Sequence, residues 1–309
     1  MATAQILDSK TNMRQPSIPD ILPPEYAQGD YVELTTISTR TSQESLPSYD
    51  NAITPADSSS SQLATSAALA TTGLQSTHTY QIETKGHPLI ALPLAPRPEP
   101  IGIFAVLPNG ELGALTYQSL RHARCSGNSV LVRADDDFAE EPLSSTAYRF
   151  GPGRPPKIQL QGEVSHEEEF EVTGKGIHTR AQNIRTHLGT FQWRYASRQE
   201  RRAIGASSLL VCDQVTSVAL LGGKQGEKRR RVAQLVRSEE LRTKGTSGST
   251  AGNGGRLVMD LREWEGRKSD VKAMEVLVLT GCVMMLKKEV DRRRAAQFMV
   301  MAGAAGGGP

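Results

Sequence analysis

The chain has 309 residues, of which 38% are hydrophobic and 5% aromatic, and its formal net charge at pH 7 is +3. That length allows one large or two small domains, and the low hydrophobic content indicates that part of the chain is disordered. The three cysteines lie far apart and form no CxxC pair, which argues against a disulfide framework or a zinc knuckle. The N-terminus has no basic segment followed by an apolar one, so we expect no signal peptide and a reducing, intracellular location.

Residues 1–77 form a predicted disordered tail. They hold three basic and eight acidic residues, a charge of −5, so residues 78–309 carry +8. From position 54 to 79 about half of the residues are Ser or Thr, which bury too little apolar area to offset the entropy of ordering. Two short motifs interrupt this tail, LPPEY at 22–26 and LPSYD at 46–50.

From His78 onward the chain consists of short apolar or alternating runs bounded by Gly, Pro, Asn or Asp. No helical pattern alternates with these runs, and their close spacing is typical of an all-β barrel or sandwich of about a dozen strands. A single helical turn is expected at 238–242, and the Gly- and Ser-rich residues 244–255 predict a flexible inserted loop. The predicted strands are 78–84, 88–94, 101–107, 111–117, 128–134, 144–150, 157–160, 168–173, 176–182, 189–197, 207–213, 217–223, 230–237 and 256–261.

The run from Val276 to Leu286, VLVLTGCVMML, has no charge and would be apolar on every side of a helix. It is too short for a membrane span, which needs about 20 apolar residues. We predict a helix over 270–294 that runs through the barrel, where Thr280 and Gly281 thin the helix at mid-length and ease the fit. The basic residues 292–294 would then neutralise the helix dipole at its C-terminus, and 297–309 would be a disordered tail.

An all-β barrel followed by one wholly apolar helix resembles the tubby C-terminal-like fold, shared by tubby proteins, phospholipid scramblases and plant LURP-one proteins. The stretches HTRAQNIRTHLGTFQWRYASRQERR (178–202) and EVLVLTGCVMMLKKEVDRRR (275–294) also resemble a group of fungal proteins of this shape. The resemblance covers about 78–296 and implies a barrel of roughly twelve strands that encloses the C-terminal helix.

Neither activity of the resembled families carries over residue by residue. The phosphoinositide-contacting residues of tubby proteins have no placeable counterparts in this sequence. The consecutive acidic residues 135–137 lack the alternating spacing and the glycine of a calcium loop.

The sharpest short motif is PPxY, formed by Pro23, Pro24 and Tyr26. Adjacent prolines favour the polyproline II helix, which docks with little loss of entropy in the aromatic groove of a WW domain. A weaker LPxY variant follows in the tail, and the two motifs could bind a tandem-WW partner bivalently. We therefore expect an adaptor whose tail recruits a WW-domain partner such as a HECT-type ubiquitin ligase; the alternative is an inert tail. The residues of the second motif are Leu46, Pro47 and Tyr49.

A second candidate site is basic. Residues 198–237 contain nine Lys or Arg and three Asp or Glu, a local charge of +6. One hypothesis is contact with a phosphoinositide or another anionic lipid, as in a peripheral or scramblase-like membrane protein. A nuclear-localisation signal and a solvated barrel rim are the alternatives. The candidate residues are Lys224, Lys228, Arg229, Arg230 and Arg231.

The remaining motifs predict no chemistry. The alternating aromatic residues at 191, 193 and 195 are expected to pack in the core rather than to stack nucleic-acid bases. The histidines do not cluster at metal spacing, and no nucleophile elbow, zinc helix, Walker loop or dinucleotide fingerprint occurs. We predict a monomeric, non-enzymatic protein with no cofactor, metal or nucleic-acid partner. We expect it in the cytoplasm, with membrane surfaces or the nucleus as alternative locations.

Overall fold

The computed structural model describes one compact unit in the C-terminal three quarters of the chain. All statements about structure below concern these residues. They are 74–92, 99–121, 127–134, 142–148, 154–161, 168–175, 179–219 and 225–305.

Twelve antiparallel strands form a closed barrel in which every strand pairs with its neighbours in sequence. Strand β1 closes the ring, because Tyr80 is paired with Ala105 of β2 on one side and with Leu257 of β12 on the other. The strands are β1 His78–Glu83, β2 Ile101–Val106, β3 Leu112–Leu120, β4 Ser129–Arg133, β5 Ser144–Ala147, β6 Lys157–Leu160, β7 Glu168–Gly174, β8 Gln182–Thr186, β9 Gly189–Tyr195, β10 Ser208–Ala219, β11 Gln225–Arg237 and β12 Gly255–Met259.

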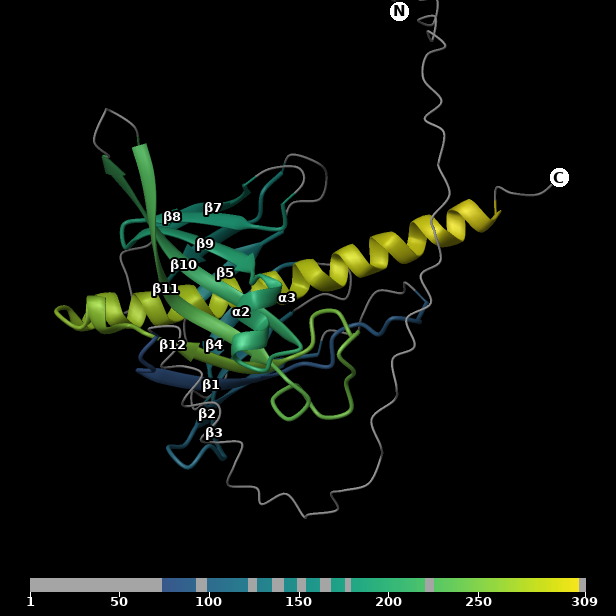
Figure 1. The fold of residues 1–309 in the computed structure, drawn as a ribbon, viewed down its shortest axis with the longest axis horizontal. Coiled ribbons are helices and arrows are strands. Elements are labelled where there is room, and N and C mark those ends of the chain that lie inside the picture. The colour runs from purple at the N-terminus through teal and green to yellow at the C-terminus, as the bar shows by residue number, and fades with distance from the viewer. Residues whose placement is uncertain are drawn as a thin grey trace, which may run out of the picture. The chain divides into compact units, whose positions relative to one another are not determined.

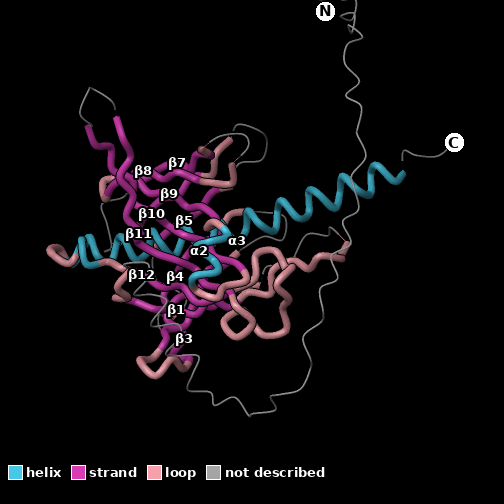
Figure 2. The backbone as a smooth tube through the Cα atoms, viewed as in Figure 1, coloured by secondary structure: helices cyan, strands magenta, loops and turns pink. Residues whose placement is uncertain are grey.

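The long helix α3 (Lys268–Ala305) runs through this barrel and projects beyond it (Figures 1 and 2). A short helix, α2 (Arg198–Ala203), lies between β9 and β10, and a single 3-10 turn, η2 (Arg262–Trp264), precedes α3. The predicted architecture of about twelve strands around one hydrophobic C-terminal helix is therefore confirmed.

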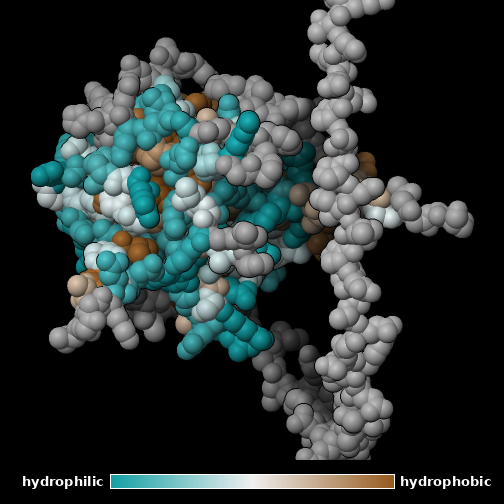
Figure 3. All heavy atoms as spheres, turned by 90° about the horizontal axis from the view of Figure 1, so that it is seen from above, coloured by the Kyte–Doolittle hydropathy of each residue, from teal (hydrophilic) through white to brown (hydrophobic). Residues whose placement is uncertain are grey.

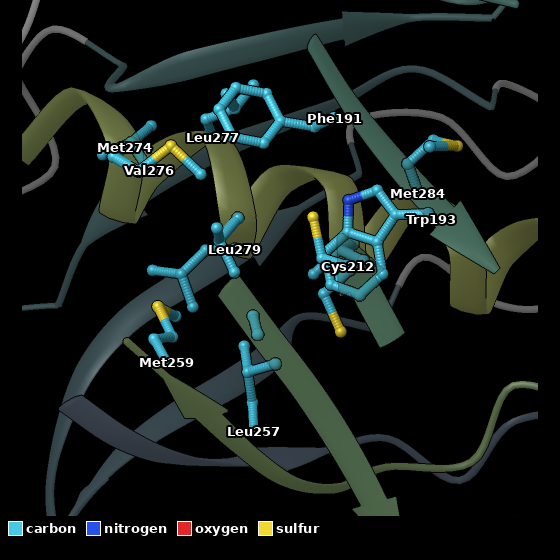
Figure 4. Packing of buried hydrophobic residues seen from close by; sticks show 14 of the residues in the cluster. Phe191, Trp193, Cys212, Leu257, Met259, Met274, Val276, Leu277, Leu279 and Met284 are labelled. Atoms are coloured by element: carbon cyan, nitrogen blue, oxygen red, sulfur yellow. The ribbon is translucent and has the colours of Figure 1, made fainter. Parts of the chain in front are cut away.

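The core lies between the inner face of the barrel and the middle of α3. All eleven residues from Val276 to Leu286 are buried. Side chains alternate between the two faces of each strand, so every second residue faces α3. Phe191 and Trp193 of β9 are examples, and both are 1% exposed. Figure 4 shows these rings beside the turns of α3. The prediction that the aromatic residues of this strand pack in the core is correct for these two.

Polar groups on the buried part of α3 find partners on the barrel wall. The hydroxyls of Thr280 and Ser144 lie 2.6 Å apart. Glu275, just before the apolar run, accepts hydrogen bonds from the hydroxyls of Tyr80 and, at 3.1 Å, of Tyr117. Burial and then the nearby carboxylate of Glu275 raise the pKa of both tyrosines, so both hydroxyls keep their protons.

Helix α3 is longer than predicted, since it begins at Lys268 and ends at Ala305 instead of spanning 270–294. The residues after 294 are mostly Ala and Met, which favour helix, and no Gly or Pro occurs before Gly303. Part of the predicted disordered tail 297–309 is therefore helical. The folded unit also begins earlier than His78, because Leu74 is 2% exposed and the backbone N of Thr77 donates to the carbonyl of Met259.

Several predicted strands have different bounds. Residues 88–92 of the predicted strand 88–94 form no strand, because the prolines at 88 and 93 cannot donate to a ladder. The predicted strands 207–213 and 217–223 are one continuous strand, β10, as far as Ala219. Strand β8 takes the place of the predicted strand 176–182 and shares only Gln182 with it.

One loop prediction is confirmed and another changes. Residues 238–242 form a single turn, closed by a hydrogen bond from the backbone N of Arg242 to the carbonyl of Ser238 at 3.2 Å. The short helix α2, which was not predicted, starts at a capping box made by Ser197 and Glu200. The loop 244–255, predicted to be flexible, is packed against the barrel and buries Thr250, Ala251 and Asn253. Its small residues allow that close packing, because Cβ atoms added at 252, 254 and 255 would each meet another atom within 2.6 Å.

Gly281 offers a direct test of the packing around α3. A Cβ atom at this position would lie 2.5 Å from Nε1 of the buried Trp193. We expect Gly281→Ala to lower the free energy of unfolding by about 1–2 kcal/mol, because overpacking outweighs the gain in helix propensity. Urea denaturation would measure it. Gly303→Ala is the control on the same helix, since nothing lies within 4 Å of the added atom. Equal stability of the two variants would contradict the close contact.

Candidate functional site

Helix α3 leaves the barrel beside a buried ion pair. Arg237, at the end of β11, and Glu289 of α3 have side chains that are 3% and 10% exposed. Arg237 donates from Nη1 to Oε2 at 2.8 Å and from Nη2 to Oε1 at 2.7 Å. This two-bond fork joins the helix to the barrel wall and fixes how far the helix reaches out of the barrel.

Two further donors complete the shell of Glu289. The hydroxyl of Tyr195 donates to Oε1 and the backbone N of Gly252 donates to Oε2, both at 2.7 Å. Burial raises the pKa of Glu289, but the hydrogen bonds and charge of Arg237 outweigh burial and hold that pKa below its ordinary value. The carboxylate therefore stays ionised although it is almost fully enclosed.

The loop 244–254 covers this ion pair. Asn253 accepts a hydrogen bond from Nη1 of Arg237 at 3.0 Å, and the carbonyl of Ser249 accepts one from Nη2 of Arg293 at 3.0 Å. A β-bridge between His87 and Ala251 fastens the loop to the segment after β1. The loop is thus held in place by the same arginines that border the site.

A cavity of about 400 Å³, which we call the mouth pocket, opens between the loop and α3. Its walls come from six separate parts of the chain. The guanidinium groups of Arg180 and Arg292 lie 5.8 and 5.7 Å from the ring centre of Tyr195, within cation–π range. Its charged and aromatic lining residues are Arg180, Tyr195, Arg237, Glu289, Arg292 and Arg293.

Two buried donors at the mouth pocket have no hydrogen-bond partner among the residues that the structure describes. They are Nε of Arg237 and Nη1 of Arg293. A buried guanidinium N–H without an acceptor is costly, so a water molecule or an ion beside such a group is stabilising. An anion in the mouth pocket could supply it.

The wider surroundings of the pocket are also cationic. Among the described residues, eight basic side chains gather where α3 leaves the barrel, and the carboxylates of Glu289 and Asp291 lie among them. Burial and then the charge of Arg292 lower the pKa of Lys288 to about 8, as expected where positive charges crowd together. We call this group the cationic collar: Arg121, Arg180, Arg237, Lys287, Lys288, Arg292, Arg293 and Arg294.

The last three members of the collar do not neutralise the end of a helix dipole. That interpretation assumed a helix ending at 294, whereas α3 continues to Ala305 and has no basic residue in its last turn. The dipole acts mainly within the last turn, so these arginines lie too far from it. They lie instead where α3 leaves the barrel, and two of them, Arg292 and Arg293, line the mouth pocket.

The basic surface predicted on β11 lies elsewhere, on a two-stranded ribbon. In Figure 1 the ends of β10 and β11 extend beyond the other strands. Alternation along β11 places Lys228 and Arg230 on one face and Arg229 and Arg231 on the other. The four residues therefore do not share one face. Lys224 lies outside the described residues.

The three arginines of this ribbon have acidic partners. Arg229 donates to Glu227 at 2.8 Å, and Arg230 pairs with Glu263 and lies over the ring of Trp264. Lys228 is exposed. Neutralised arginines bind an added anion less strongly than free ones, so this ribbon is the weaker candidate for an anion site.

Arg231 belongs to a balanced network of two arginines and two carboxylates on the outside of the barrel. It donates to Glu200 at 2.6 Å and to Asp213 at 3.2 Å, and Arg194 contacts the same two carboxylates. Hydrogen bonds, above all from Arg194, hold the pKa of Glu200 below its ordinary value despite partial burial. This network anchors α2, which positions no part of the mouth pocket.

The cysteines and other metal-type ligands form no site in the described residues. Burial raises the pKa of the Cys212 thiol and raises that of Cys282 to about 12, so both keep their protons. No group of three His, Cys, Asp or Glu side chains in the described ranges could hold a metal ion. The WW-motif residues Pro23, Pro24, Tyr26, Leu46, Pro47 and Tyr49 lie outside the described residues.

No family model matches the chain, and no curated protein or solved structure matches it. The resemblance to the tubby-like group therefore stays a prediction. The fold and the site together define a closed antiparallel barrel with a central helix and an arginine-lined pocket at the exit of that helix. None of the described helices is long and apolar enough to cross a membrane.

The Arg237–Glu289 pair can be tested by single and double substitution. Arg237→Met leaves a buried carboxylate without its counter-charge, so we expect the free energy of unfolding at pH 7 to fall by about 3–5 kcal/mol. Adding Glu289→Met removes that charge and should recover much of the loss. Chemical denaturation of both variants measures the difference. A double variant that is less stable than the single one would contradict the assigned role.

The same pair predicts a pH dependence. The folded-state pKa of Glu289 is depressed, so its stabilising contribution is present above the unfolded pKa of about 4.3 and is lost as pH falls through the folded pKa. The stability difference between the wild type and Arg237→Met should therefore be largest near pH 7 and shrink at lower pH. A difference that is constant from pH 7 to 3 would contradict this.

Proposed function

We propose that the protein is a non-enzymatic binding protein that takes a phosphate-bearing anion into the mouth pocket. The observation that carries this proposal is the pair of unsatisfied buried donors, Nε of Arg237 and Nη1 of Arg293, beside a pocket with excess positive charge. Guanidinium groups bind phosphate oxygens through paired, charge-assisted hydrogen bonds. An anion there would lie beside two guanidinium groups that each keep one N–H without an acceptor in the described residues.

The size and chemistry of the pocket favour a polar ligand with more than one anionic group. Its volume of about 400 Å³ is in the lower range of small-molecule sites. Arg180 and Arg292 are exposed at its edge, and Arg237 and Glu289 form its floor. One anionic group would meet Arg293 while a second meets the outer arginines. A phosphorylated polyol, free or as the headgroup of a lipid, has this chemistry.

The ribbon of β11 is the competing location for such an anion. Each of its arginines has a carboxylate partner, whereas in the described part of the chain two carboxylates, Glu289 and Asp291, lie among the eight basic residues of the cationic collar. Coulomb attraction for an added anion scales with net charge, so the mouth pocket is the better supported of the two. We therefore propose that an anionic lipid headgroup binds where α3 leaves the barrel, and not on β11 as the sequence predicted.

Titration calorimetry with a soluble inositol polyphosphate tests the pocket. We expect binding that weakens as salt concentration rises, and a loss of about tenfold or more in affinity for Arg293→Gln, because a hydrogen bond to a charged group contributes about 1.5–3 kcal/mol. Arg267→Gln is the matched control, since that side chain is 81% exposed and lies before α3. If both variants lose affinity equally, the attraction is diffuse and the pocket is not the site.

A second proposed function concerns the N-terminal tail and rests on sequence alone. The PPEY motif, with LPSY after it, fits the groove of a WW domain, so we propose that the tail recruits a tandem-WW protein such as a HECT-type ubiquitin ligase. The barrel would then supply the ligand specificity of an adaptor.

The tail proposal has a simple binding test. Replacing Tyr26 and Tyr49 with Ala should reduce capture by an immobilised tandem-WW domain to background, and each single change should weaken it because bivalence is lost. Tyr31→Ala is the control, since this tyrosine lies in the same tail outside both motifs. Capture by the double variant at the wild-type level would refute the proposal.

A further inference from the structure

The end of α3 beyond the cationic collar is an uncharged helix with exposed apolar side chains. From Ala295 to Ala305 the sequence contains no Asp, Glu, Lys or Arg. Four consecutive apolar residues here are exposed: Phe298 by 59%, Met299 by 77%, Val300 by 73% and Met301 by 42%. Figure 3 shows hydrophobic surface on this part of α3, where it projects from the hydrophilic outside of the barrel. We call residues 295–305 the helix tip.

The apolar residues of the helix tip point in all directions around the helix axis. Successive residues of a helix are turned by 100°, so four consecutive apolar side chains cover its whole circumference. A helix that docks in a protein groove is apolar along one stripe and polar on the other side. The helix tip has no such polar side, so hydrocarbon that surrounds it would bury more of its apolar surface than a protein groove that covers one side.

A second apolar segment lies against the same helix tip. Leu89 and Ile90, in the segment after β1, are 55% and 92% exposed, and Leu92 is 67% exposed. Gln297 joins the two parts, because its Nε2 donates to the carbonyl of Leu89 at 2.8 Å and its Oε1 lies 2.8 Å from Nε2 of His87. Residues 88–92, which form no strand, and the helix tip therefore lie next to each other and form one exposed apolar surface.

We propose that this surface docks on an anionic membrane and that the helix tip enters one leaflet. Eleven helical residues span about 16 Å, close to half of the roughly 30 Å hydrocarbon core. Five residues of the cationic collar, between Lys287 and Arg294, lie directly before the helix tip in sequence, and the other three lie at the same end of the barrel. Once the tip is inserted, the collar would lie at the level of the lipid headgroups, where basic residues are attracted by anionic lipids.

The collar also argues against the other obvious occupant, a second copy of the chain. Two tips that pack on each other would bring two collars close together, and like charges at that distance repel. An anionic surface, in contrast, is complementary to the collar. Charge complementarity thus favours the membrane over self-association, and docking through the helix tip does not require an anion in the mouth pocket.

Vesicle flotation of the full chain tests the proposal. We expect the protein to float with vesicles that contain phosphatidylserine and to float much less with pure phosphatidylcholine. Val300→Asp should lower the partition coefficient by about tenfold or more, because a charge in the hydrocarbon region is strongly unfavourable. Leu112→Asp is the matched control, since this leucine of β3 is 52% exposed and should leave flotation unchanged.

A fluorescent reporter measures the depth of insertion. Both native tryptophans, Trp193 and Trp264, are buried in the barrel, so Phe298→Trp adds a signal from the helix tip. We expect a blue shift of its emission with anionic vesicles and quenching by lipids brominated in one acyl chain. An unshifted emission, or flotation that Val300→Asp leaves unchanged, overturns the proposal.

Further measurements separate this proposal from the others. Dimers in light scattering that disappear with Val300→Asp, without flotation of the wild type, would show that a second copy covers the surface and would overturn the membrane assignment. Arg293→Gln should weaken binding of the soluble polyphosphate about tenfold or more, and its effect on flotation should be smaller, because seven residues of the collar remain. Absence of polyphosphate binding by the wild type therefore refutes only the mouth pocket, and absence of vesicle binding by the wild type refutes only the helix tip.

Discussion

The whole unit depends on keeping the middle of α3 away from water. Its eleven residues from Val276 to Leu286 carry no charge and leave no side of the helix to be solvated. A single open sheet would cover one side, whereas a closed barrel covers all sides and also pairs every strand edge. The contact of Gly281 with Trp193 shows how tightly this enclosure is made, because not even one methyl group fits between them.

Two carboxylates set the position of the helix along the barrel axis. Glu275 comes directly before the apolar run and meets two tyrosine hydroxyls, while Glu289 follows the run and meets Arg237. A slip of the helix by one turn would bury either carboxylate among apolar side chains, at a cost of several kcal/mol. The helix therefore has one register in the barrel. That register decides which residues emerge, and hence the composition of the cationic collar and the helix tip.

The sequence predicts the buried parts better than the exposed ones. Hydrophobic alternation and turn residues identify most strands, and the uncharged run identifies the core helix, because both patterns follow from burial. The capping box at Ser197 and Glu200 was a readable signal for α2, and the helix formers after position 294 were a readable signal for the longer α3. The mouth pocket could not be predicted, since Arg180, Arg237, Ser249 and Arg293 come from four segments that only the closed barrel brings together. The loop 244–255 was misjudged for a related reason, because its small residues allow close packing as well as flexibility.

The order of residues along α3 connects the core to the proposed functions. An apolar segment inside the barrel is followed by the basic belt from Lys287 to Arg294 and then by a second apolar segment in the helix tip. In a helix that ended at the belt, these arginines would only solvate the exit and offset the dipole. Because the helix continues, the belt separates two apolar environments, one made by the barrel and one left open. Positive charge between these two apolar environments is complementary to a layer of anionic groups, such as lipid headgroups. A site that binds phosphate groups can reach its ligand when it lies at that layer. The mouth pocket occupies this position, which is why binding of an anion and docking of the helix tip are compatible in one orientation of the protein.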